Sequence, residues 1–163
     1  MKTALLAALA FTAFASPSFA GELQFPSDAP VATITFPDDW SAQETETGID
    51  ASSPDESIYF AVDVAEAKDQ DAVVAEAVKY LASQGVTVDT ATAKESKGKL
   101  NGMDVVNVNW SGTDKDGPVT IGLAALAANA EKVLVATYWG TQGEQDKNTE
   151  AMGAIINSLK PVQ

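Results

Sequence analysis

The clearest alternation of apolar and polar positions runs from Met103 to Gly140. It consists of three consecutive segments, MDVVNVNWSGT, PVTIGLAALAA and KVLVATYWG, separated by Asp114-Lys115-Asp116-Gly117 and Asn129-Ala130-Glu131. Each segment is rich in β-branched, Leu or aromatic residues and is bounded by Gly, Asp or Asn, which is typical of strands joined by hairpin turns. We therefore expect three antiparallel strands that pair in sequence order.

Four further segments have strand patterns. Residues 57–65 alternate cleanly, 31–36 are rich in β-branched residues, and 41–52 are polar and predict a weak edge strand that pairs back on 31–36. Residues 86–100 end at Asn101-Gly102, a dipeptide that strongly favours a two-residue hairpin turn. The segment 86–140 is thus predicted to be a four-strand antiparallel meander.

Two segments have apolar residues at helical spacing. The first covers residues 69–84, with Asp69 as its N-cap, and the second covers 144–159, where Thr141 and Glu144 resemble a capping box. Apolar stripes of this kind pack one face of a helix on a sheet. Strands and helices of this order predict an α+β fold.

The first 20 residues have the pattern of a secretory signal peptide. A positively charged start precedes the apolar stretch Ala4–Ala15, and Ser18 and Ala20 are small residues where a signal peptidase cleaves. We expect cleavage after Ala20, a periplasmic or secreted location and no membrane anchor. Residues 21–30, with two prolines, are expected to be a flexible N-terminal arm, and residues 31–163 a single domain.

Composition excludes several kinds of site. The chain contains no Cys, His or Arg, so zinc, copper, haem and iron–sulfur centres lack their usual ligands and general base catalysis lacks its usual residue. A net charge of −13 disfavours nucleic acid and anionic membranes as partners. We expect no cofactor and no enzymatic activity.

Several short motifs and the order of the elements resemble the PsbP-like superfamily. The motifs are FPDDW (36–40) after the first strand, Asn101-Gly102 before a Val-rich strand, and IINSLKP (155–161) in the closing helix. This superfamily includes the PsbP proteins of photosystem II, the Ran-binding Mog proteins and small exported bacterial proteins. The resemblance implies a central antiparallel sheet of about six to seven strands flanked by two main helices in an α/β/α sandwich. It also implies an accessory or binding role, and it carries no catalytic residues over.

Acidic residues are the only metal ligands that this chain has in quantity. Asp114-Lys115-Asp116-Gly117 begins like a calcium loop, but the twelfth position, which should be a bidentate Glu, is Ala125. A hairpin turn is therefore favoured. The weak calcium candidates are Asp38, Asp39, Asp114 and Asp116.

Aromatic and amide side chains supply the candidate contact residues. Trp40 follows a Pro-Asp-Asp turn and is expected at a loop tip, whereas core packing is favoured for the other aromatics, including Tyr138. Asn107 and Asn109 share one face of their strand, and that face is either open to solvent, which is favoured, or lines a groove.

Two classes of function remain after these exclusions. The first is an exported, monomeric, non-catalytic binding or accessory module that contacts an unidentified protein partner in the cell envelope through a sheet edge and the Trp40 loop. The alternative is a small-ligand or calcium-binding protein that uses carboxylates, or a hydrolase that uses neither His nor Cys. The alternative predicts a concave acidic pocket with a perturbed Asp or Glu.

Overall fold

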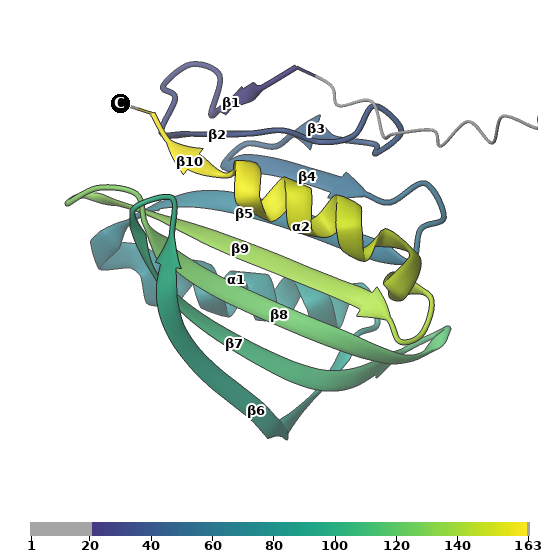
Figure 1. Cartoon of the computed structure of the whole chain (residues 1–163). Helices are drawn as coiled ribbons and strands as arrows, with labels where there is room; N and C mark the ends of the chain where they lie inside the picture. The colour runs from purple at the N-terminus through teal and green to yellow at the C-terminus, as the bar shows by residue number, and fades with distance from the viewer. Residues whose placement is uncertain (1–20, 163) are drawn as a thin grey trace, which may run out of the picture.

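The computed structural model describes residues 21–162 (Figure 1), so the expected signal peptide lies outside the described residues. The strands are β1 (Leu23–Phe25), β2 (Ala32–Ile34), β3 (Gln43–Glu44), β4 (Gly48–Ser52), β5 (Ile58–Glu66), β6 (Thr87–Leu100), β7 (Met103–Asp114), β8 (Gly117–Ala127), β9 (Lys132–Thr141) and β10 (Lys160–Pro161). The helices are α1 (Gln70–Ser83) and α2 (Thr149–Ser158), each preceded by a 3-10 turn, η1 (Ala67–Asp69) and η2 (Gln145–Asn148).

A seven-stranded antiparallel sheet forms the centre, with strand order β3-β4-β5-β9-β8-β7-β6. Helix α1 covers one face, and α2 lies on the other face together with a small second sheet (Figure 1). Strands β6 to β9 pair in sequence order, which confirms the predicted meander. The predicted α+β class and the size of the central sheet are also confirmed.

The N-terminal segment differs from the prediction. Residues 21–30 are not a loose arm: β1 pairs with β2, and the side chain of Phe25 is 1% exposed. Strand β2 pairs with β1 and β10 in the separate three-stranded sheet, while β4 pairs with β5 instead of β2. The sequence pattern identified the strand at 31–36 but not its partners, because pairing between distant strands is not encoded in local alternation.

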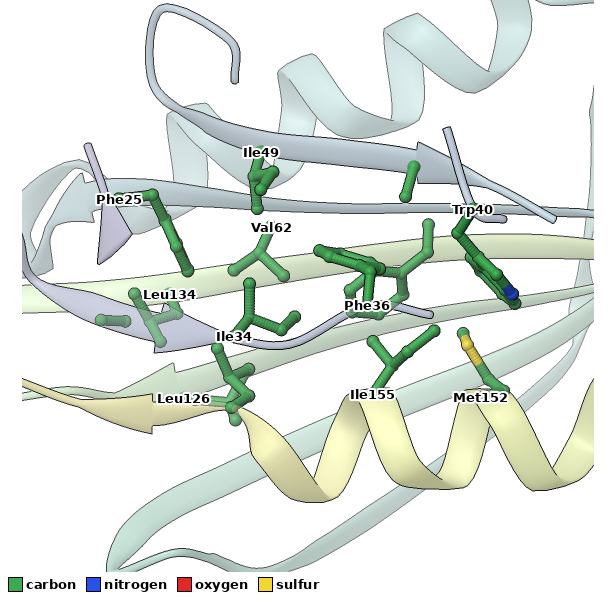
Figure 2. Packing of buried hydrophobic residues seen from close by; sticks show 14 of the residues in the cluster. Phe25, Ile34, Phe36, Trp40, Ile49, Val62, Leu126, Leu134, Met152 and Ile155 are labelled. Carbon is green, nitrogen blue, oxygen red and sulfur yellow. The ribbon is translucent and has the colours of Figure 1, made fainter. Parts of the chain in front are cut away.

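The main core lies between the small sheet, α2 and the central sheet (Figure 2). Trp40 is part of this core and is 5% exposed, with its ring 6.4 Å from that of Phe36. The expectation that Trp40 is exposed at a loop tip is therefore wrong. The neighbouring Asp38 and Asp39 are exposed, but the indole packs inward against Phe36 and Met152 (Figure 2).

The boundaries of α1 are within one residue of the prediction at both ends, whereas α2 agrees with the prediction only at its C-terminal end. Helix α1 starts one residue after Asp69, which is its N-cap residue although its side chain makes no capping hydrogen bond. Helix α2 begins at Thr149 instead of Glu144, and its N-cap is Asn148. The expected capping box does not form: Thr141 ends β9, and the 3-10 turn at Gln145–Asn148 lies between it and α2. No helix among residues 21–162 is long and apolar enough to cross a membrane.

Candidate functional site

A cavity of about 400 Å³ lies between the central sheet and α2, and we call it the α2 cavity. Strand β6 (residues 96–100) forms one wall, and Ile156 and Leu159 form the other. The β6–β7 turn lies near β10 (Figure 1). There, Asn101 Nδ2 donates hydrogen bonds to the carbonyl oxygens of Asn157 and Leu159, each 2.8 Å long. The hairpin is thus tied to the C-terminal end of α2.

Small residues form the floor of the α2 cavity. Gly122, Ala124 and Ala136 face α2 from β8 and β9, whereas the opposite face of β8 carries the buried Ile121 and Leu123. Successive side chains of a strand point to opposite faces, so a large residue on one face and a small one on the other is compatible with a single strand. The floor leaves the volume that larger side chains would otherwise fill.

Three polar side chains from β7 and β9 line the floor of this apolar cavity. Asn109 pairs with Gly122 across β7 and β8, and Gly122 pairs with Tyr138 across β8 and β9, so these three residues lie in one row across the sheet. Asn107 is one alternation further along β7, opposite Ala124. Burial raises the pKa of Tyr138, so its hydroxyl stays protonated near neutral pH and can both donate and accept.

These polar side chains are not used by the protein itself. Within residues 21–162, the side chains of Asn107, Asn109 and Tyr138 make no hydrogen bond to another residue. Two carboxamides and one phenol therefore present free donors and acceptors to whatever enters the cavity. Of the two alternatives left open for Asn107 and Asn109, the structure shows the second, because both line a cavity.

A second cavity, of about 320 Å³, lies on the opposite face between α1 and the β3–β5 end of the sheet, and we call it the α1 cavity. Asp50, Asp63 and Glu76 line it together with Tyr59 and Tyr80. Burial raises the pKa of Asp63, and the negative charges of Asp50 and Glu76 raise it further. A concave acidic pocket with a perturbed carboxyl group is what the alternative function predicted.

The four weak calcium candidates do not form a metal centre. Asp38 and Asp39 follow β2, whereas Asp114 and Asp116 belong to the β7–β8 turn. Asp114 Oδ1 accepts hydrogen bonds from the backbone N–H groups of Asp116 and Gly117, at 2.9 and 3.1 Å. Among residues 21–162 there is no group of three or more acidic side chains that could hold a metal ion. The acidic residues of this turn stabilise the hairpin.

The sequence interpretation named Asn107, Asn109 and Tyr138 but missed the floor of the α2 cavity and the hydrogen bonds that tie the β6–β7 turn to α2. A partial signal for the floor is present, because Gly122 and Ala124 alternate with the large residues Ile121 and Leu123 in β8. No sequence pattern predicts that the Asn101 side chain binds the end of α2. Its two acceptors, Asn157 and Leu159, are more than 50 residues away.

Comparison with known proteins gives structural matches only. No family model and no curated protein sequence matches the chain. The solution structure of the cyanobacterial PsbP, CyanoP, from Synechocystis sp. PCC 6803 is similar with a TM-score of 0.59 at 11% identity, over 96% of this chain and 99% of that one. LpqN of Mycobacterium tuberculosis, a protein involved in cell envelope biogenesis, is similar with a TM-score of 0.55 at 14% identity, over 89% of this chain and 92% of that one.

A crystal structure from Bacteroides thetaiotaomicron is also similar, with a TM-score of 0.54 at 14% identity over 81% of this chain and 45% of that one. All three likenesses concern the fold. The chain has a PsbP-like fold, as its sequence resemblance implied.

Proposed function

We propose that this protein is an exported, non-catalytic binding module that holds an extended peptide segment of a protein partner in the α2 cavity. The observation that carries this proposal is the set of three polar side chains, Asn107, Asn109 and Tyr138, which line an apolar cavity without protein hydrogen-bond partners. The cavity volume of about 400 Å³ is large enough for one apolar side chain of the partner.

The chemistry of the cavity suits a peptide. A carboxamide offers one acceptor and two donors, and a peptide bond offers one of each, so the two groups pair well. Asn107 and Asn109 are two residues apart on β7, which spaces their side chains by about 7 Å. Two residues of an extended peptide span the same distance. Each carboxamide can therefore form hydrogen bonds with one of two successive peptide groups on the same edge of a bound strand.

The lining offers little for catalysis. Ser96 and Lys99 both border the cavity, but Ser96 pairs with Asn107, whereas Lys99 is three positions further along β6, opposite Asp104. Lys99 Nζ also forms an exposed ion pair with Asp104 Oδ1 at 2.5 Å. Side chains three positions apart on a strand point to opposite faces, so these residues do not form a nucleophile–base pair. The cavity has no carboxylate among its described lining residues.

Export is part of the proposal and rests on the pattern of residues 1–20. It agrees with the involvement of LpqN, a structural neighbour, in cell envelope biogenesis. A location in the cell envelope provides the protein partners that the proposal needs. Fractionation of cells that express the full chain tests this directly: mature protein that begins at Gly21 in the periplasm or medium supports export, and full-length protein in the cytoplasm contradicts it.

The binding site is tested by filling the cavity. Ala124→Leu places a larger side chain on the floor, and Val106→Leu is the matched control, because Val106 is 40% exposed and lies on the opposite face of the sheet. Both variants and the native protein would be coupled to resin, and cell-envelope extract would be passed over them after chemical crosslinking. We expect at least one protein to be retained by the native chain and by Val106→Leu but lost with Ala124→Leu.

A random heptapeptide library displayed on phage gives a second, independent readout. Selection on the native protein should enrich peptides with one recurring apolar residue, and the double variant Asn107→Ala/Asn109→Ala should bind them at least about tenfold more weakly. Equal binding by the native protein and Ala124→Leu would show that the α2 cavity is not the site. Thermal unfolding of each variant checks that the fold is kept.

A further inference from the structure

The α1 cavity carries more negative charge than its surroundings neutralise. Asp50, Asp63 and Glu76 line it, and none of the three forms a salt bridge with a lysine among residues 21–162. Thr47 Oγ1 donates a 2.7 Å hydrogen bond to Asp63 Oδ1, and the Tyr59 hydroxyl donates a 3.3 Å bond to Asp50 Oδ2. One oxygen of each aspartate is thereby held in place, while the other oxygen has no partner in the described protein.

Thr137 supplies an independent indication of a ligand. It is 3% exposed, and its Oγ1 is buried without any hydrogen-bond partner. Thr137 pairs with Ala61 across β9 and β5, so the side chains of both residues point from the sheet towards α1, and both line the α1 cavity. A buried hydroxyl without a partner destabilises a protein, so a bound donor at this position would remove that cost.

Aromatic rings border the same cavity. The rings of Tyr59 and Tyr80 both line it, with centroids 5.7 Å apart. Tyr59 is further held by Trp139, whose ring is stacked on it at 4.4 Å. Aromatic faces attract cations and pack against the carbon atoms next to a charged nitrogen.

We propose that the α1 cavity binds a small organic cation through a primary ammonium group. The N–H groups would donate to Asp63, Asp50 and Thr137 Oγ1, and the attached carbon chain would lie against Tyr59 and Tyr80. A primary ammonium has three donors, one for each of these three acceptor side chains. The cavity volume of about 320 Å³ has room for the ammonium and several carbon atoms.

A metal ion does not fit this arrangement. Calcium needs six or more oxygen ligands within about 2.6 Å of one point. No group of three or more acidic side chains among residues 21–162 is arranged to hold a metal ion. An organic cation spreads its contacts over a larger volume, so the carboxylates do not have to converge. This site is separate from the α2 cavity, on the other face of the sheet, and its function goes beyond peptide binding.

The test is a titration of isotope-labelled protein with n-butylamine hydrochloride, followed by amide NMR shifts near neutral pH. We expect saturable shifts in residues 59–63, 76–80 and 137. Tetramethylammonium chloride has the same charge but no N–H donor, so it should bind at least about tenfold more weakly. Calcium chloride at equal ionic strength should give no saturable shifts at these residues.

Three variants separate the proposal from a general attraction of cations to an acidic protein. Thr137→Val keeps the shape of the side chain and removes its acceptor, and Asp63→Asn removes one charge from the cavity. Glu150→Gln is the matched control, because it removes one charge from an exposed position on α2. Thr137→Val and Asp63→Asn should weaken n-butylamine binding about tenfold, and Glu150→Gln should leave it unchanged.

Thr137→Val has a second readout that does not depend on the ligand. Without ligand, its thermal midpoint should equal or exceed that of the native protein, because an unpaired buried hydroxyl has been removed. Weaker n-butylamine binding together with undiminished stability supports the proposal. Equal binding of n-butylamine by all variants, or equal affinity for tetramethylammonium, would overturn it. Ala124→Leu, in the α2 cavity, should not affect n-butylamine binding, so failure of one site is distinguishable from failure of the other.

Discussion

The ring of Tyr138 occupies the space in which a side chain at Gly122 would lie. A Cβ atom added to Gly122 would be 2.2 Å from Cε1 and 2.6 Å from Cδ1 of Tyr138. It would also come within 3.1 Å of Asn109 Oδ1. The absence of a side chain at Gly122 is therefore what allows Tyr138 to lie across the floor of the α2 cavity beside Asn109.

Gly122→Ala should destabilise the protein by displacing Tyr138. The new methyl group is too close to two ring atoms, so the ring has to move, at a cost of about 1–3 kcal/mol. In a Tyr138→Ala background the same change should cost much less, because the clash is gone. Chemical denaturation of the native protein, both single variants and the double variant measures this coupling. Additive effects of the two changes would contradict the packing described for Gly122 and Tyr138.

Asn101 should contribute to stability through its side chain and not only through the turn. It has a φ of 47°, a conformation that glycine adopts without strain, so Asn101→Gly keeps the turn and removes the bonds to Asn157 and Leu159. We expect a loss of about 1–2 kcal/mol.

Hydrogen exchange provides the local measurement for the same variant. Amides at the β6–β7 turn should exchange faster in Asn101→Gly, whereas those of the β7–β8 turn should not change. Asn101→Asp retains the shape of the side chain but directs a carboxylate at two carbonyl oxygens, so it should destabilise at least as much. A fully stable Asn101→Asp variant would argue against the two hydrogen bonds.

Trp40→Ala should unfold or strongly destabilise the protein. The side chain is buried with Phe36 and Met152 in the main core, and deletion of a buried Trp creates a large cavity, which costs about 3–5 kcal/mol. Trp40→Phe leaves a smaller cavity and should cost less. Urea denaturation checks both variants. If Trp40→Ala kept the native stability and only lost partner binding, the burial described here for Trp40 would be incorrect.

Asp55 should make stability depend on pH in the acid range. Loss of some hydration opposes ionisation of its carboxyl group. Hydrogen bonds from Ser57, Ser53 and Asn148 outweigh this effect and lower its pKa from 3.8 to about 2. The folded state therefore favours the charged form. Its contribution is complete above about pH 4 and is lost as the pH falls towards 2.

The carboxyl group of Asp55 is exposed, so solvent screening reduces its contribution to about 1 kcal/mol. Asp55→Asn removes this titration. Urea denaturation at several pH values should show a stability difference between the native protein and Asp55→Asn that is constant above pH 4 and shrinks below it. A difference that does not change between pH 5 and pH 2 would contradict the low pKa. Other carboxyl groups titrate in both proteins and cancel in the comparison.

Much of the fold could be read from local pattern. The strands at 57–65 and 86–140, and the helix after Asp69, were predicted within a few residues, because side-chain periodicity and turn residues act between near neighbours. The capping box predicted at Thr141 and Glu144 does not form, because the 3-10 turn at Gln145–Asn148 precedes α2.

The functional candidates depended more on distant contacts. Asn107, Asn109 and Tyr138 were named from strand pattern and aromatic type, but only the tertiary structure shows that they share one cavity. The Pro-Asp-Asp turn before Trp40 predicts that its side chain lies at a loop tip. The structure buries it, since the chain brings β2 and α2 together over the central sheet.

The sequence by itself determined the strand at 57–65, the helix after Asp69 and the order of the four-strand meander, and it contains no Cys, His or Arg. The tertiary structure decided the partners of β2, the hydrogen bonds from Asn101 to the end of α2 and the position of Thr137 in a cavity lined by carboxylates. The physical reason is the distance along the sequence between the residues that interact. Periodicity and turn geometry depend on neighbouring residues, whereas cavities form where residues far apart in the chain pack together and leave space.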